Sequence, residues 1–482
     1  MGVESGGTHW GRGVQVTNVE SEVRRSGNMS EENQNFWLQM PQSLEALYAT
    51  ASPNETVELY SGELILRLDG REMAGDGRIL LKWLPAPRAL FEIDSLSGHI
   101  PLDDGALYVP ALNYSCPASV LRSSNAWGPG GRRANCGGIV RDDGVPTSSM
   151  VDQVVFHLPN FHPYLGESIR DADRTGAWRG RLILEHGLWR IHLDAVPNAD
   201  QLRKLLKADG GFAITNVGSI QLQHSTLFPL TDAADILDAL YYYFSFARGI
   251  WCGPLLPIAF DAGVKKWSRW EPPRIREWRG RRSWFPESDY AVVQSLNEAF
   301  SGFMRLWDDA LWRDPIKTAI HWYIEANTNA GGVEGGIVLV QTALELLSWV
   351  YLVEDEASKE MSANRFNNKV QAGERIASLL QKLSIPTEIP RRLLALTSAA
   401  TALQATDGAG ALVNLRNAIV HPKQSRRRKV TEVGVSARIE ALTLGLWYLE
   451  LALLRLFGYN GIYWSRLRSG YPEEVCDTVP WI

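Results

Sequence analysis

The sequence predicts an α+β protein in which a β-rich N-terminal domain is followed by an all-α helical bundle. The chain has 482 residues, more than one hydrophobic core usually serves, so at least two domains are expected. Residues 36–225 alternate apolar and polar positions as strands do, whereas the pattern after Pro286 repeats at helical spacing. We therefore expect a β-rich domain over 36–286, a helical domain over 287–470 and a C-terminal tail over 471–482.

The first residues, the cysteines and the most apolar run indicate where in the cell the protein is expected. Residues 1–35 are rich in Gly, Ser, Asn and Glu and lack the blocks of a secretory signal, so we expect a disordered start. The chain has four cysteines, too few and too scattered for a disulfide framework, which indicates reduced thiols. The most apolar run, 337–353, includes Gln341 and Glu345 and is shorter than the roughly 20 residues of a membrane span. The sequence thus predicts a cytoplasmic protein with no membrane segment.

Two segments near the start of the β-rich domain have the alternation of paired strands. Residues 55–68 and 78–93 mix branched and aromatic residues with polar ones. Turns between them are expected at residues 69–70 and at the Gly-Asp-Gly of residues 75–77. Further along, the Gly-rich residues 128–133 lack the ending of a phosphate-binding loop, so we expect a surface loop there.

A helix is expected over 231–247, towards the end of the β-rich domain. Thr231 is a suitable N-cap, acidic residues follow in the first turn, and Gly249 stands just past the end.

Residues 265–282 combine basic and aromatic residues. They carry eight basic residues against two acidic ones, interleaved with Trp267, Trp270 and Trp278. Basic residues with aromatic rings suit single-stranded nucleic acid, which makes several of the arginines candidates for RNA contact. We favour the alternative, that the three Trp side chains hold a linker between the domains. The candidate arginines are Arg279, Arg281 and Arg282.

After Pro286 seven segments have helical spacing and are separated by short Gly, Asp or Pro breaks. They are residues 290–312, 315–327, 335–353, 364–383, 390–405, 409–420 and 435–457. The last is apolar nearly all round, so we expect it at the centre of the bundle or covered by a partner.

The strongest local signal is Leu-Arg-Asn-Ala-Ile-Val-His-Pro at residues 415–422. Arg416 lies in a predicted helix, and the proline at 422 pushes His421 out of the helical conformation, which frees its ring to turn toward neighbours. A second pair with the same spacing, Arg181 and His186, lies on a predicted strand, where an odd separation puts the side chains on opposite faces. Only the pair at 416 and 421 is therefore expected to share a substrate.

With Arg416, Asn417 and His421 in a helical domain, residues 290–468 resemble the HEPN family, whose signature is Arg, often a polar residue, and then His after four to six intervening residues. Many HEPN proteins are metal-independent ribonucleases that dimerise to bring two motifs together, and others are scaffolds without catalysis. The resemblance also implies an inward acid on a preceding long helix, which makes Glu345 a candidate to orient Arg416. In HEPN toxins controlled by nucleotidylation a Tyr stands two positions after the His, where this chain has Lys423.

The chemistry of these residue types is coherent with RNA cleavage. The 2′-hydroxyl of RNA is the nucleophile, so cleavage needs a base, an acid for the leaving oxygen and a cation for the phosphorane charge. A His side chain can act as base or acid, and an Arg can clamp phosphate oxygens. Asn417 can donate to a phosphate or hold the His421 ring. One His per chain cannot be base and acid at once, so we expect a homodimer, with no metal or cofactor and no cleavage of DNA.

Structural alternatives accompany each of these residues. Arg and His near a helix C-terminus stabilise the helix dipole without any catalytic role. Glu345 can be a satisfied acid in a buried helix. The basic run just after the motif can be a solvated loop, or it can contact RNA phosphates beside the site. Its candidate RNA-binding residues are Lys423, Arg426, Arg427, Arg428 and Lys429.

The sequence therefore predicts a metal-independent endoribonuclease with RNA as its substrate. Proteins that resemble this layout, a front domain on a HEPN domain as in ApeA-like proteins, often serve bacteria in abortive anti-phage defence. The front domain would then sense a phage-derived or nucleotide trigger. The rival hypothesis is a catalytically silent HEPN scaffold whose front domain binds a protein or nucleotide, and a carbohydrate-binding front domain has only the 18 Trp residues behind it.

Overall fold

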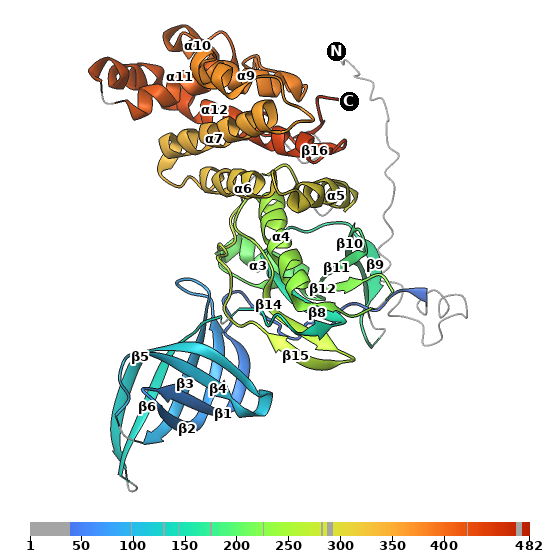
Figure 1. The fold of residues 1–482 in the computed structure, drawn as a ribbon, viewed down its shortest axis with the longest axis vertical. Helices are drawn as coiled ribbons and strands as arrows, with labels where there is room; N and C mark the ends of the chain where they lie inside the picture. The colour runs from blue at the N-terminus through green and yellow to red at the C-terminus, as the bar shows by residue number, and fades with distance from the viewer. Residues whose placement is uncertain are drawn as a thin grey trace, which may run out of the picture.

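The computed structural model shows three units in succession along the long axis of the molecule: a barrel, a sheet covered by helices, and a helical bundle (Figure 1). The predicted α+β class, β-rich first and helical second, is confirmed. The structure describes residues 39–97, 99–128, 131–142, 144–173, 176–224, 226–280, 283–286, 293–421, 423–468 and 475–482. The predicted disordered start, 1–35, lies outside them.

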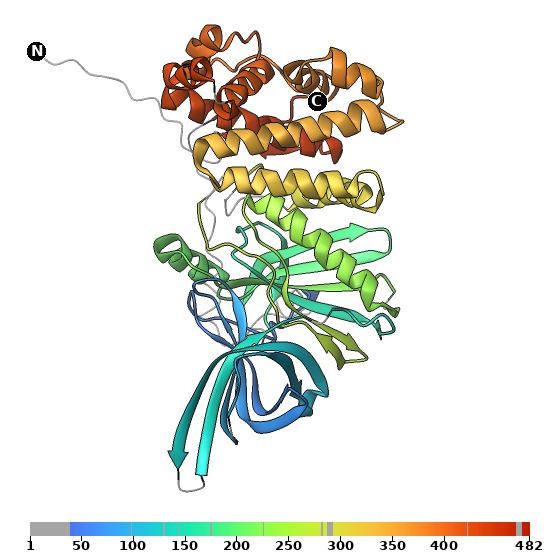
Figure 2. The same cartoon turned by 60° about the vertical axis from the view of Figure 1, so that its left-hand side comes forward.

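The first unit is a closed six-stranded barrel with its own apolar interior. Its strands are β1 (Val57–Leu68), β2 (Arg71–Lys82), β3 (Arg88–Ser97), β4 (Asp104–Val109), β5 (Tyr114–Gly128) and β6 (Gly131–Val140). They close in the order β1-β2-β3-β6-β5-β4, with every neighbouring pair antiparallel. Figure 2 shows the long β5–β6 hairpin extending past the barrel. Of the residues expected in a surface loop, 128 and 131–133 belong to these strands, and 129–130 lie outside the described residues.

One turn expected in the barrel is wrong, and the reason is steric. The chain does turn at residues 69–70, but residues 75–77 lie inside β2 and pair with β1. A Cβ at Gly75 would come 2.7 Å from the Asp94 carbonyl oxygen, and one at Gly77 would come 2.4 Å from that of Glu92. These glycines therefore permit close approach of a neighbouring strand rather than a turn.

The second unit is a seven-stranded sheet in the order β15-β14-β8-β12-β11-β10-β9. Its strands are β8 (Gln153–Pro159), β9 (Glu167–Arg170), β10 (Ala177–His186), β11 (Trp189–Ala195), β12 (Ile214–Leu222), β14 (Leu255–Asp261) and β15 (Val264–Ser268), and a small pair joins β7 (Met150–Val151) to β13 (Phe228–Pro229). The β-rich stretch predicted as one domain thus contains two sheets with separate cores.

Helices cover both faces of this sheet because its strands are apolar on both sides. Val154 and Phe156 of β8 contact the core that holds α4 (Leu230–Arg248), whereas Val155 contacts the core that holds α3 (Ala199–Asp209). Continuous apolar strands of this kind are typical of a sheet buried on both faces.

The helix α4 begins one residue before the predicted one. Its N-cap is Pro229, so Thr231 does not cap it, because Thr231 is already in the first turn. The end is as expected, with Gly249 in the left-handed conformation at φ 74°.

The Trp/Arg-rich segment begins in strand β15, which holds Trp267, and then runs as a linker toward the bundle. Trp267, Trp270 and Trp278 are at most 5% exposed, and each lies in a different one of the three main apolar cores. The favoured interpretation is confirmed, since rings buried in this way cannot stack on the bases of a single strand.

The third unit is helical, and seven segments were expected there. It consists of α5 (Gln294–Asp308), α6 (Arg313–Asn327), α7 (Gly332–Trp349) with a π-helical extension (Val350–Glu354), α8 (Ala363–Lys369), α9 (Ala372–Lys382), α10 (Leu394–Leu403), α11 (Gly408–Val420) and α12 (Gln424–Leu456). The helix predicted over 364–383 is two helices, because the backbone is extended at Gln371, where a new N-terminus is capped through Glu374. Within α12 the chain breaks at Gly434, with φ 76° and ψ 166°.

Residues Gly332–Glu354 are long and apolar enough to cross a membrane, but 61% of the apolar window is buried inside the protein. The helix packs against α6, α9, α11 and α12. It is the buried helix expected at 337–353, and such helices occur in the cores of soluble proteins. The tail also packs: β17 (Cys476–Thr478) pairs with β16 (Ile462–Trp464).

Buried His157 makes stability depend on pH. Its Nε2 accepts a hydrogen bond from the Tyr48 backbone N–H at 3.1 Å, and burial lowers its pKa to about 4. The unfolded chain takes up this proton at an ordinary pKa of 6.5, so stability is lost as pH falls from 6.5 towards 4. We expect His157→Gln, which keeps an acceptor and does not titrate, to remove about 3 kcal/mol of that pH dependence in urea unfolding. The same change at exposed His99 should leave the pH dependence as in the wild type, and an equal slope in all three proteins would contradict the assignment.

The start of α11 depends on a side-chain cap. The Asp407 carboxylate accepts a hydrogen bond from the Gly410 backbone N–H at 2.6 Å. We expect Asp407→Ala to lower the free energy of unfolding by about 1 kcal/mol. Asp407→Asn keeps a capping oxygen and should cost clearly less. Equal losses for the two variants in urea titrations would show that the cap is not what Asp407 contributes.

Candidate functional site

The motif residues lie at the C-terminal end of α11. This helix packs against α7, α9 and α12 through Leu412, Leu415 and Ala418, which are buried. Its N-terminus lies close to Tyr448, since a Cβ on Gly408 would come 2.2 Å from the Tyr448 hydroxyl. Packing of the apolar face and the close contact at Gly408 together hold α11 in place. They thereby position the motif at its C-terminal end.

His421 terminates the helix as predicted. Its backbone is extended, at φ −90° and ψ 128°, and its N–H donates to the Asn417 carbonyl oxygen at 3.3 Å. The side chain is exposed. A solvent-accessible imidazole at a helix end is free to reach a bound molecule.

Arg416 is half-buried and is turned toward its neighbour in sequence. Its Nη1 donates to Asn417 Oδ1 at 3.2 Å, while its Nε is buried without a hydrogen-bond partner among the described residues. Leaving a buried donor unpaired is costly. A phosphate oxygen reaching Nε would remove that cost.

Glu345 does not have the partner expected from the resemblance. Its carboxylate lies 3.9 Å from Arg375 Nη1 on α9, and among the described contacts it makes none with Arg416. The physical reason is that α9 packs against both α7 and α11. The guanidinium of Arg375, on α9, therefore lies beside Glu345. The acid on the long helix is present, but its partner is Arg375, which no motif in the sequence marks.

Asn417 also lines a groove of about 650 Å³ beside α11. The other walls come from α9 and from the connection between α10 and α11, and amide, hydroxyl and carboxylate groups predominate. The polar residues of the groove are Gln371, Glu374, Ser378, Gln381, Gln404, Thr406, Asp407, Asn414 and Asn417. Such a surface can exchange hydrogen bonds with the edges of unpaired bases.

The basic run after the motif is helical rather than a loop. Helix α12 begins at Gln424, so residues 424–429 form its first turns. Lys423 and Arg428 are exposed and Lys429 is half-buried, whereas the side chains of Arg426 and Arg427 lie outside the described part of the structure.

The arginines of the linker do not share the groove at the motif. Arg279 forms an ion pair with Glu277 and lines a different hollow with Phe212 and Thr328. Arg281 and Arg282 lie outside the described residues. Among the described residues, Arg279 of the linker and Asn417 of the motif therefore line different hollows.

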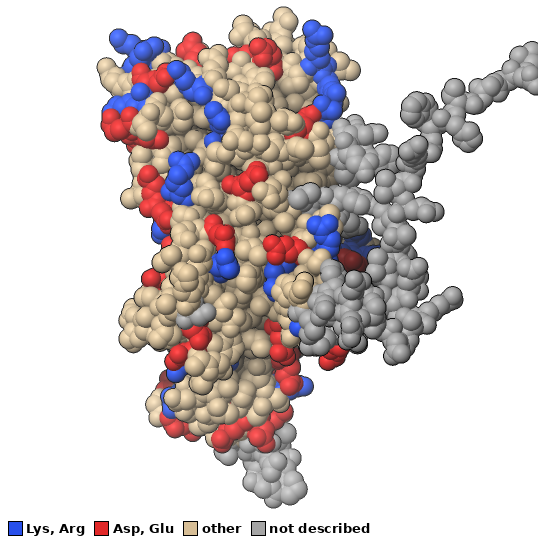
Figure 3. Space-filling view, turned by 90° about the vertical axis from the view of Figure 1, so that its right-hand side faces the viewer, with Lys and Arg blue, Asp and Glu red and all other residues tan. Residues whose placement is uncertain are grey.

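The surface charge agrees with this separation. On the face drawn in Figure 3, Lys and Arg side chains are interspersed with Asp and Glu over the part of the chain that is described. The net charge of the whole chain is −5. Long-range attraction of a nucleic acid is thus weak, and binding has to come from local groups.

The other histidines of the front units have structural surroundings. His162, like His157, is fully buried, and desolvation together with nearby Arg248 lowers its pKa well below 6.5. His186 binds Asp308 at 2.7 Å and so joins the sheet to α5, while Arg181 pairs with Asp194. This confirms that the second Arg/His pair is not one site. Within the described residues, no three His, Cys, Asp or Glu side chains gather as metal ligands would.

Comparison with known proteins follows the units of the structure. Residues 146–281, which hold the seven-stranded sheet, match the model of the YopA central domain, and residues 309–477 match that of the YopA C-terminal domain. The chain is 27% identical over 451 residues to the SPbeta prophage-derived uncharacterized protein YopA of Bacillus subtilis (strain 168). That similarity covers 91% of this chain and 98% of the relative. No solved structure matches the chain.

Proposed function

We propose that the chain is a metal-independent endoribonuclease of the HEPN type, which cleaves RNA through its 2′-hydroxyl and acts as a cytoplasmic homodimer. The observation that carries the proposal is the end of α11. There Arg416 and Asn417 are hydrogen-bonded, Asn417 lines a polar groove, and exposed His421 follows directly.

Each of these side chains supplies one requirement of the reaction. His421 takes the proton of the 2′-hydroxyl or gives one to the leaving 5′-oxygen. Arg416 turns its guanidinium from Asn417 Oδ1 to the phosphate, where its charge and its unpaired Nε–H stabilise the phosphorane. Asn417 is then released to donate to a phosphate oxygen or to the base lying in the groove.

The homodimer follows from the count of histidines. In the described part of the helical unit the other His is His321, whose ring lies 5.4 Å from that of Trp251, on the side of the sheet. A second His421 for the acid step therefore comes from a second chain. Val435 and Ile439, one turn apart on α12, are 59% and 48% exposed and are side chains that a dimer interface would bury.

A second candidate function is a silent scaffold. It is favoured by the partner of Glu345, because Arg375 takes the acid that would otherwise orient Arg416. In that case the front units bind a protein or nucleotide, and the bundle holds copies of the chain together.

The biological setting is proposed from resemblance. A relative whose name places it in a prophage of Bacillus subtilis fits a role that involves phages. We propose abortive anti-phage defence, with a phage-derived or nucleotide trigger acting on the front units.

We expect His421→Ala to lower the rate of RNA cleavage by about 10²-fold or more, since a general acid–base group is lost. The measurement is cleavage of total RNA in the presence of a chelator, with analysis of end chemistry. Products should end in a 2′,3′-cyclic phosphate, and single-stranded DNA should stay intact.

His321→Ala is the matched control, because it removes the other imidazole of the helical unit and leaves the motif. Unchanged cleavage in His421→Ala would contradict the assignment and favour the scaffold. So would a loss of chelator-resistant cleavage in His321→Ala while His421→Ala stays active.

A mixing experiment tests whether two chains share one site. Wild type and His421→Ala are refolded together in varied proportions, so that chains pair at random. If each site needs both imidazoles, activity follows the square of the wild-type fraction. A linear dependence would show that one chain suffices.

A further inference from the structure

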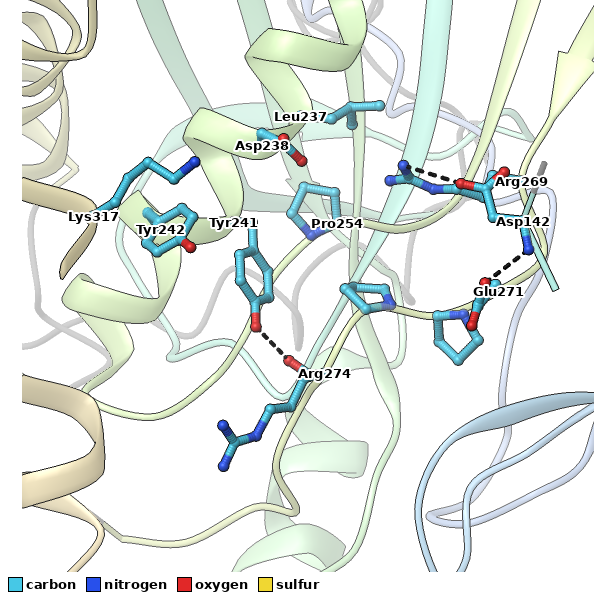
Figure 4. Close-up of a pocket in the computed structure, with 12 residues that line it drawn as sticks. Asp142, Leu237, Asp238, Tyr241, Tyr242, Pro254, Arg269, Glu271, Arg274 and Lys317 are labelled. Atoms are coloured by element: carbon cyan, nitrogen blue, oxygen red, sulfur yellow. Dashed lines mark hydrogen bonds and ion pairs between the residues drawn. The ribbon is translucent and has the colours of Figure 1, made fainter. Parts of the chain in front are cut away.

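A second hollow, of about 360 Å³, lies where the front units meet the bundle (Figure 4). Asp142 follows the last barrel strand, Tyr241 and Tyr242 belong to α4, and Lys317 comes from α6. The linker supplies Arg269 and the two prolines that follow Glu271. A ligand held here would touch the sheet unit and the helical bundle at once.

Several polar groups of this hollow are already occupied and form its frame. The Tyr241 hydroxyl donates to the Arg274 carbonyl oxygen at 2.9 Å, and the Arg274 guanidinium pairs with Glu325 at 2.9 Å. The Glu271 carboxylate accepts the Asp142 backbone N–H at 2.7 Å. These contacts hold the linker in place and are not available to a ligand.

Among the described residues Lys317 and Asp238 make no ion pair, and Arg269 makes a long one. The Lys317 ammonium lies 5.4 Å from the ring centre of Tyr242 and makes no ion pair among the described residues. Arg269 reaches Asp142 only at 3.7 Å, and Asp238 makes no described hydrogen bond or ion pair. In Figure 4 Lys317 and Arg269 extend toward the middle of the hollow from opposite sides, with Asp238 between them.

The balance of these groups favours an anion. Desolvation in the hollow raises the pKa of Asp238 despite the nearby cations Arg269 and Lys317, which act in the opposite direction. Lys317 and Arg269 thus face two carboxylates, Asp142 and Asp238, and Asp238 gives up its charge more readily than usual. A second carboxylate-sized or phosphate-sized anion would be clamped between Lys317 and Arg269, with the Tyr242 hydroxyl as a further donor.

We propose that this hollow binds the phosphate group of a small phosphorylated ligand between Lys317 and Arg269, beside the Asp238 side chain. The volume suits a small molecule and not a folded nucleic acid. The rings of Pro254, Pro272 and Pro273 give the rest of the ligand an apolar wall. The site lies apart from the motif at His421, so it does not depend on the proposed nuclease activity.

The test measures binding of inorganic phosphate, pyrophosphate and glycerol phosphate to the full chain by calorimetry. Lys317→Met and Arg269→Gln should each weaken binding about tenfold or more, because each removes a charge-assisted hydrogen bond. Asp238→Asn should strengthen it, since the carboxylate charge opposes the anion. Lys317→Arg keeps the positive charge and should therefore bind more tightly than Lys317→Met.

A control separates this site from other cations. Lys266→Met removes an exposed lysine on the neighbouring β15 that pairs with Asp261 at 3.3 Å. This variant should bind as the wild type does. Absence of binding to every probe, weaker binding in Asp238→Asn, or loss of binding in Lys266→Met as large as in Lys317→Met would overturn the proposal.

Discussion

The arrangement of the molecule depends on the burial of α4 between the sheet and the bundle. Its residues Leu237, Leu240 and Phe244 belong to one continuous apolar core that extends from β8 to α12. Burial of such side chains contributes about 1.5–3 kcal/mol each, so sliding the bundle along the sheet would expose a large apolar area. At the end of α4 the buried charge of Arg248 is satisfied by the carbonyl oxygens of Asn160 and Arg279 and by the Trp278 ring, 4.5 Å away.

This constraint makes the sheet and the bundle one body and gives the two proposed sites different positions in it. The hollow at Lys317 borders α4 and α6 directly. The motif lies on α11, in another layer of the bundle (Figure 1). The packing of α6 on α7, and of α7 on α11, connects the two sites through continuous contacts between helices.

How far the sequence predicts the molecule depends on the range of the forces involved. The change from strands to helices and the release of His421 by a proline are local effects, and both are present. The turn predicted at Gly75 and Gly77 is wrong because these glycines make room for strand β3, which is distant in sequence. Tertiary packing also creates the pairing of Glu345 with Arg375 and the hollow at Lys317. The spacing of residues along the chain therefore does not predict them.

Electrostatics links the proposed dimer to RNA binding. Among the described basic groups near the motif, Lys423 and Arg428 are exposed, and the described linker residue Arg279 lies at another hollow. On the face drawn in Figure 3 the described Lys and Arg side chains are interspersed with Asp and Glu, which weakens attraction of a polyanion there. A two-fold axis beside the end of α11 would bring two copies of the first turns of α12 together and double the local positive charge where two His421 side chains meet. In the proposed dimer, the same symmetry that completes the acid–base pair would therefore also add phosphate contacts.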